Sequence, residues 1–155
     1  MKIDKEINSL LAEYADFWSI SDLQINYLKE SICLTLISVK EKEIVKTFIE
    51  FKEVMSCYYF QDIFPGTTSC RLNEFQDTEL LLLSEIGYHP KGYGQVNIKS
   101  LDLDLTEIES ISSKTNFCFE INNKDVFLIE ANSININEKS FENLIMNSSA
   151  LKNPF

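Results

Sequence analysis

The sequence predicts a single α+β domain over residues 1–155, with an antiparallel β-sheet built from hairpins, an N-terminal amphipathic helix and a short C-terminal helix. Three observations predict this class. Apolar residues recur at helical spacing at the start of the chain, alternating runs joined by turn residues fill its middle, and no linker divides it. A chain of 155 residues with 45% hydrophobic residues is large enough to bury one core.

Helices are predicted at the two ends of the chain. The first covers residues 3–16, because five apolar side chains share one helical face: Ile3, Ile7, Leu10, Leu11 and Tyr14. Near the end, Phe141, Leu144 and Ile145 have the spacing of a short C-terminal helix. The segments between these helices are expected to form strands.

The first half of the chain predicts hairpin-linked strands. Alternating apolar and polar residues from Ile20 to Tyr27 indicate a half-buried strand, and a turn at Leu28–Ser31 leads to a second strand, Ile32–Val39. The charged run Lys40–Glu43 is a solvated turn. The β-rich segment 44–54 follows it, and Met55–Phe60 is either another strand or an extension of that one.

The second half begins with a loop at Phe64–Ser69. The secondary structure of the following segment, 72–90, is ambiguous, because its short apolar run suits a helix or a strand. A strand is favoured for Thr78–Ile86. The later elements follow in order. They are a loop at Gly87–Gly94, a strand at Val96–Leu105, a hairpin with strands Asn116–Ile121 and Val126–Ala131 around the turn Asn122–Asp125, and continued alternation at Ser133–Asn137.

The charge of the chain is strongly acidic, and the excess is concentrated in its second half. The net charge is −10, and residues 72–138 contain 12 acidic against 4 basic residues. Nucleic-acid binding is not expected, because it depends on Lys and Arg that neutralise phosphates. Acidity of this kind serves solubility, or it suits a basic protein partner.

The expected compartment is the cytoplasm. No apolar run approaches the roughly 20 residues that span a bilayer, and the charged N-terminus does not resemble a signal peptide. The four cysteines have no metal-binding spacing, and three of them lie in apolar runs where a reduced thiol behaves as a small hydrophobe. They are Cys33, Cys57, Cys70 and Cys118.

The loop Gly87–Gly94, with the sequence GYHPKGYG, contains the only histidine of the chain. His89 is therefore the one histidine that could act as a base beside a nucleophile. The loop does not have the Gly-x-x-x-x-Gly-Lys-Ser/Thr pattern of a phosphate-binding loop, so a nucleotide is not expected. Tyr88, His89 and Tyr93 are instead candidates for contact with a partner, and the alternative is an ordinary loop.

The acidic segment that follows the loop is the strongest candidate cluster. On a strand, Leu101, Leu103 and Leu105 would face one side, and Asp102 and Asp104 the other. Together with Glu107 and Glu109, these aspartates form a solvated face, a hard-metal site or a surface for a basic partner. The short motif Glu50-Phe-Lys52 resembles part of a nuclease site but lacks a matching upstream aspartate. No cofactor is expected.

The pattern of elements resembles small bacterial immunity-type domains that are encoded beside polymorphic or contact-dependent toxins. The likeness comes from the N-terminal helix, the first hairpin, the run Thr47–Val54 and the late hairpin that ends in Glu130–Ile136. It implies a cytosolic, non-enzymatic protein that blocks one toxin through an acidic face. No family residue can be transferred position by position, and residues 71–93 have no counterpart.

Two hypotheses about function follow. The first is a non-enzymatic module that binds a basic protein toxin, with a partner-binding set of seven residues: Asp102, Asp104, Glu107, Glu109, Tyr88, His89 and Tyr93. The second is a small metal-dependent or histidine-assisted hydrolase built on His89 or the acidic strand. The identity of the partner and the oligomeric state stay open.

Overall fold

The computed structural model describes residues 2–61 and 81–145, and most of these residues are in β-strands. The α+β prediction is therefore wrong: the described chain is a large antiparallel sheet with one short helix. Phe141, predicted as part of a C-terminal helix, instead pairs with Ile134 in a strand, and of the described residues after it only Leu144 and Ile145 have helical backbone. The predicted loop Phe64–Ser69 and Cys70 lie outside the described residues.

The elements follow the predicted order in the first half of the chain. Helix α1 spans Lys2–Ala12 and ends before the predicted residue 16, because Glu13–Phe17 form turns in which Asp16 has a φ of 67°. The first strands are β1 (Ser19–Asn26), β2 (Ser31–Lys40) and β3 (Glu43–Phe60). The last of these covers both predicted β-rich segments, so Met55–Phe60 is an extension and not a separate strand.

The second half contains six more strands: β4 (Leu81–Tyr88), β5 (Gly94–Leu101), β6 (Glu107–Thr115), β7 (Phe117–Ile121), β8 (Asp125–Ile136) and β9 (Lys139–Phe141). The predicted strand at Thr78–Ile86 is confirmed for its described part, and so is the hairpin now labelled β7–β8. The predicted strand Val96–Leu105 is wrong beyond Leu101, where the chain turns.

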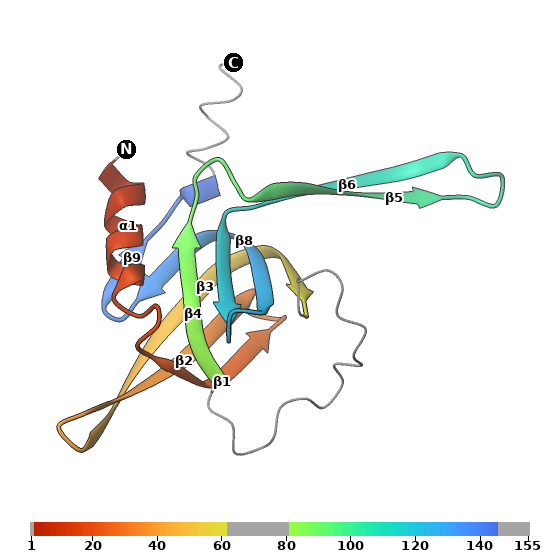
Figure 1. The fold of residues 1–155 in the computed structure, drawn as a ribbon. Helices are drawn as coiled ribbons and strands as arrows, with labels where there is room; N and C mark the ends of the chain where they lie inside the picture. Colours follow the sequence, from red (N-terminus) through yellow and green to blue (C-terminus); the bar gives the residue numbers. More distant parts are fainter. Residues whose placement is uncertain (1, 62–80, 146–155) are drawn as a thin grey trace.

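Six of the strands form a sheet that closes on itself. The neighbours in order are β1, β2, β3, β8, β7 and β4, with β4 pairing back to β1, and every pairing is antiparallel. Strand β3 is long enough to pair with β2 through its first half and with β8 through its second. Figure 1 shows this closed sheet, with α1 beside it and the β5–β6 hairpin extending away from it.

The closure between β1 and β4 is short and is completed by α1. Only Ser19 and Ile20 of β1 pair with β4 as strand residues. Beyond them, the side-chain amide of Asn8 in α1 donates to the carbonyl of Tyr88 and accepts from its backbone N–H, both at 2.8 Å. Asn8 therefore takes the place of a neighbouring strand, because the backbone groups of Tyr88 would otherwise lack these partners.

The core lies inside the closed sheet and under α1. Aromatic rings fill its centre: Phe51 contacts Phe117 edge-to-face at 5.1 Å, and Phe119 stacks on Phe127 at 4.7 Å between centroids. Ile7 and Leu11 of α1 are fully buried against it. Burial of this many large apolar side chains supplies the main driving force for folding. No helix in the described residues has the length and apolar character needed to cross a lipid bilayer.

Candidate functional site: a projecting arm and an apolar groove

The predicted partner-binding residues lie at opposite ends of one feature, which we call the arm. The arm consists of β5, the turn 102–106 and β6. Among the described strands, β5 and β6 pair only with each other, and the arm extends from the closed sheet (Figure 1). Tyr88, His89 and Tyr93 lie at its root, and Asp102, Asp104 and Glu107 lie at its tip. The eight residues of β5 separate the two groups by roughly 25 Å, so the predicted partner-binding residues belong to two separate surfaces.

Asp102 organises the tip of the arm. Its carboxylate oxygen Oδ1 accepts hydrogen bonds from the backbone N–H of Asp104, at 3.0 Å, and of Thr106, at 2.8 Å. This is ordinary turn chemistry for aspartate, and Leu105 adopts a φ of 63° to close the turn. The prediction of a leucine face opposite an aspartate face is therefore wrong, because these residues are in a turn and not in a strand.

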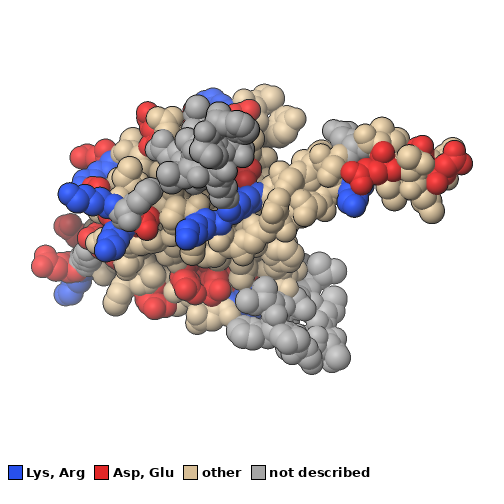
Figure 2. Space-filling model, turned by 90° about the horizontal axis from the view of Figure 1, so that it is seen from above, with Lys and Arg blue, Asp and Glu red and all other residues tan. Residues whose placement is uncertain are grey.

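The tip presents acidic and apolar side chains together. Leu103 and Leu105 are among the most exposed leucines, at 103% and 76% of full exposure. Glu107 forms a 3.4 Å ion pair with Lys99 on the opposite strand. Glu109 pairs with Ser100 in the backbone register, and its side chain is not described. Figure 2 shows acidic side chains gathered at the far end of the arm.

The strands of the arm also expose large apolar side chains. Ile98 and Ile111 are directly opposite one another on the same face of the hairpin, at 52% and 55% exposure. Leu101 and Ile108 are exposed nearer the tip. A two-stranded ribbon that leaves such residues in water is marginal by itself, and exposed apolar surface of this kind is typical of an interaction site.

The root of the arm is fixed to the closed sheet by polar contacts. Asn116, which is buried between β6 and β7, donates to the carbonyl of Ala131 at 2.9 Å and accepts from its N–H at 3.0 Å. The hydroxyl groups of Ser56 in β3 and Ser113 in β6 share a hydrogen bond, and the Lys114 N–H donates to Glu130 at 2.7 Å. These contacts hold the direction in which the arm leaves the sheet.

The three predicted root residues have different environments. Tyr88 is buried in the core, where its ring contacts Phe117, so its prediction as a partner contact is not favoured by its position. His89 is exposed, and its ring lies edge-on to Tyr93 at 5.8 Å. Tyr93 is partly exposed, and its hydroxyl approaches Gly87, where an added Cβ would lie 2.8 Å from that oxygen.

The Cys118 thiol and the nearby Tyr93 hydroxyl have environments that are unfavourable for nucleophilic chemistry. Burial, with smaller contributions from Glu120 and Glu85, raises the pKa of the Cys118 thiol to about 11. Burial, with Cys118 and Glu85 nearby, raises the pKa of Tyr93 to about 12. Both groups are therefore protonated at neutral pH, whereas a reactive cysteine requires a thiolate. Within the described ranges, no three His, Cys, Asp or Glu residues are arranged to hold a metal ion.

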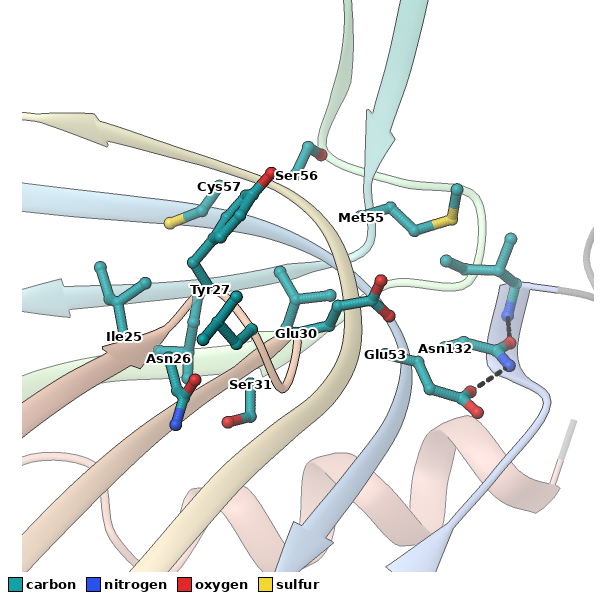
Figure 3. Close-up of a pocket in the computed structure, with 14 residues that line it drawn as sticks. Ile25, Asn26, Tyr27, Glu30, Ser31, Glu53, Met55, Ser56, Cys57 and Asn132 are labelled. Atoms are coloured by element: carbon teal, nitrogen blue, oxygen red, sulfur yellow. Dashed lines mark hydrogen bonds between the residues drawn. The ribbon is translucent and has the colours of Figure 1, made fainter.

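A second surface, which the sequence interpretation missed, is an open groove of about 970 Å³ at one end of the closed sheet. Figure 3 shows its labelled side chains, which come from the end of β1, the turn after it and the start of β2, from β3 and from β8. Tyr27 and Leu28 in the turn are 87% and 90% exposed, and Met55 on β3 is 70% exposed. Two adjacent large apolar residues, Tyr27 at the end of the predicted strand and Leu28 in the predicted turn, were the signal for this surface.

Glu53 shapes the β3 side of the groove. It has a φ of 51° beside the irregularity in pairing between Val54 and Ser56, where β3 bends. Its carboxylate accepts hydrogen bonds from the Asn132 side-chain amide at 2.6 Å and from the Ser133 hydroxyl at 3.1 Å (Figure 3 shows the first). The bend and these bonds keep the carboxylate of Glu53 at the rim of the groove.

By its structure, the chain is a closed antiparallel sheet with a projecting arm and an apolar groove at one end. A family model described as YxiG-like protein matches residues 7–141, and the chain therefore belongs to the YxiG-like family. No curated protein matches the chain significantly, and no solved structure does.

Proposed function

We propose that this chain is a non-enzymatic protein-binding module that neutralises a basic bacterial protein toxin in the cytoplasm. The observation that carries the proposal is the arm, which projects from a completed core and exposes apolar side chains beside an acidic tip. The core gains little from these side chains. A partner that covers them gains their burial, at roughly 25 cal/mol per Å² of apolar surface.

The chemistry of the arm supports a basic protein as the partner. Apolar side chains such as Ile98 and Leu103 supply contact area, and the carboxylates of Asp102, Asp104 and Glu107 supply complementary charge. Exposed carboxylates at the end of a projecting hairpin are the first groups that a basic protein approaches, so they should mainly increase the rate of association. The resemblance to immunity-type domains supports a toxin as this partner.

The test uses the protein encoded by the gene adjacent to that of this chain, purified and immobilised, with association rates measured at several salt concentrations. We expect the association rate to fall steeply as ionic strength rises, because exposed charges are screened. The double variant Asp102→Asn with Asp104→Lys keeps an acceptor at position 102 for the turn. It should slow association about tenfold or more.

A matched control separates the site from net charge. Glu41→Gln with Glu43→Lys makes the same change in charge at the β2–β3 turn, where both residues are exposed. This control should associate nearly as fast as the original chain. Equal slowing by the two double variants, or rates that do not change with salt, would contradict the assignment of binding to the tip.

A further inference from the structure

The second half of β3 has an open edge that faces the groove. Strand β2 pairs with β3 only as far as Phe51, whereas β8 pairs with β3 as far as Phe60. Within residues 2–61 and 81–145, no strand therefore pairs with Met55–Phe60 on the side away from β8. Alternate residues of a strand direct their N–H and C=O groups to each side, so this edge presents donors and acceptors for another strand.

The turn between β1 and β2 marks where an added strand would begin. The N–H of Val54 donates to the carbonyl of Glu30 at 2.8 Å, and this is the last backbone bond from the β1–β2 turn to β3. A segment that continued beyond Glu30 in the line of β2 would lie in the groove. The groove lining includes Met55, Ser56 and Cys57 of β3 itself, so the groove runs along the first half of the open edge (Figure 3).

The side chains around this edge indicate what would bind. Ile25, Tyr27 and Leu28 supply an apolar wall that is largely exposed. The charged residues in the lining are Glu30 and Glu53, and both are carboxylates. Lys29 and Lys52 are their neighbours in sequence but are not part of the lining. An extended segment with alternating apolar side chains and a flanking Lys or Arg complements this surface.

We propose that Met55–Phe60 of β3 accepts an extended segment of the partner protein as an additional strand, with its apolar side chains against Tyr27 and Leu28 and its basic residues near Glu30 and Glu53. Backbone pairing supplies affinity in such strand addition, and pockets for alternate side chains supply specificity. The inference rests on the proposed function only in taking the occupant to be part of a protein partner. Its test needs no knowledge of that partner.

The probe is a short synthetic peptide in which valine and threonine alternate, with lysine at both ends. We expect saturable binding by isothermal titration calorimetry, with NMR amide shifts concentrated at Met55–Phe60 and at the β1–β2 turn. Two N-methylated forms report the geometry, one methylated at the valine amides and one at the threonine amides. Only one of these two sets faces β3 in an added strand, so one form should lose binding and the other keep it.

Variants of the chain test the groove wall. Tyr27→Ser with Leu28→Ser should weaken binding of the peptide about tenfold or more, because the variant removes two apolar side chains of the groove wall. The matched control is Val39→Ser with Ile44→Ser. These residues form an exposed apolar pair at the far turn, opposite one another in β2 and β3, and this variant should keep its affinity.

Several results would overturn the inference. They are equal binding by both N-methylated peptides, loss of binding by both, shifts that concentrate on β5 and β6, and equal weakening by the wall and control variants. None of these results bears on the association rates that test the arm. Slow, salt-independent association with the neighbouring gene product would count against the proposed function and leave the strand-addition result unchanged.

Discussion

The β7–β8 hairpin and the arm are consecutive antiparallel pairs with opposite surroundings. In β7–β8, the side chains of Phe117 and Ile129 are directly opposite and fully buried. In the arm, the side chains of Ile98 and Ile111 are also directly opposite, yet each is more than half exposed. Backbone pairing is the same in both cases. The difference is the cover that other strands give, so the first hairpin serves folding and the second is available for contact.

The largest expected effect is in the covered hairpin. Phe119→Ala removes a fully buried ring that stacks on Phe127 and Phe51, and it should lower the free energy of unfolding by about 3–5 kcal/mol in urea denaturation. The same substitution at Phe17, which is 76% exposed, should change stability by less than about 0.5 kcal/mol. Similar losses at the two positions would show that the aromatic cluster does not hold the closed sheet together.

The junction between the two hairpins should give the next largest effect. Asn116→Ala removes both hydrogen bonds to the backbone of Ala131 and leaves that buried N–H and C=O without these partners. We expect a loss of about 2 kcal/mol or more in the free energy of unfolding. Asn97→Ala, on an exposed position of the arm, is the matched control and should be nearly neutral. Wild-type stability in Asn116→Ala would mean that other contacts fix the root.

The contrast also explains which strands could be predicted. The β7–β8 hairpin has alternation and an asparagine turn in one short window, and both are local signals. Pairing of β3 with β8 joins Ile49 to Ile136, and no local pattern reports a contact at that distance in sequence. The closure of the sheet was therefore missed. The predicted fold class was wrong as well, because Phe141, predicted as helical, pairs in β9 beside β8.

The candidate site was predicted in composition and missed in geometry. Alternation from Leu101 to Leu105 favoured a strand, but the Asp102 carboxylate competes for the backbone amides of Asp104 and Thr106 and makes a turn. The strand β6 was missed because its sequence, EIESISSKT, is polar for a strand. That polarity suits a hairpin without cover on either face. The groove was missed because its wall is assembled from segments that are far apart in sequence.

Within the arm, the expected effect on folding is small. Ile98→Ser with Ile111→Ser removes one cross-strand apolar pair that water already surrounds, and the free energy of unfolding should fall by less than about 1 kcal/mol. The corresponding pair in the covered hairpin, Phe117→Ser with Ile129→Ser, should prevent stable folding. Chemical denaturation compares the two directly. A large loss from the arm variant would show that the arm is part of the cooperative core.

The smallest effect concerns charge pairs, which are repulsive at one place on the closed sheet and attractive on the arm. On the closed sheet, Glu85 and Glu120 are directly opposite, and burial together with the Glu85 carboxylate raises the pKa of Glu120. The folded state therefore holds more protons than the unfolded state just above pH 4.5, so this carboxyl lowers stability as the pH rises through that window. On the arm, Glu107 is paired with Lys99 instead.

Glu120→Gln should accordingly stabilise the chain at pH 7 by about a few tenths of a kcal/mol, since the group is partly exposed and screened by solvent. The gain should disappear below pH 4.5, where the original carboxyl is protonated in both states. Glu107→Gln should have the opposite sign at pH 7, because it removes an attractive pair. Urea denaturation of both variants at the two pH values checks the signs. Destabilisation by Glu120→Gln at neutral pH would mean that Glu85 and Glu120 do not repel, and that the outer face of the closed sheet holds its charges as favourably as the arm does.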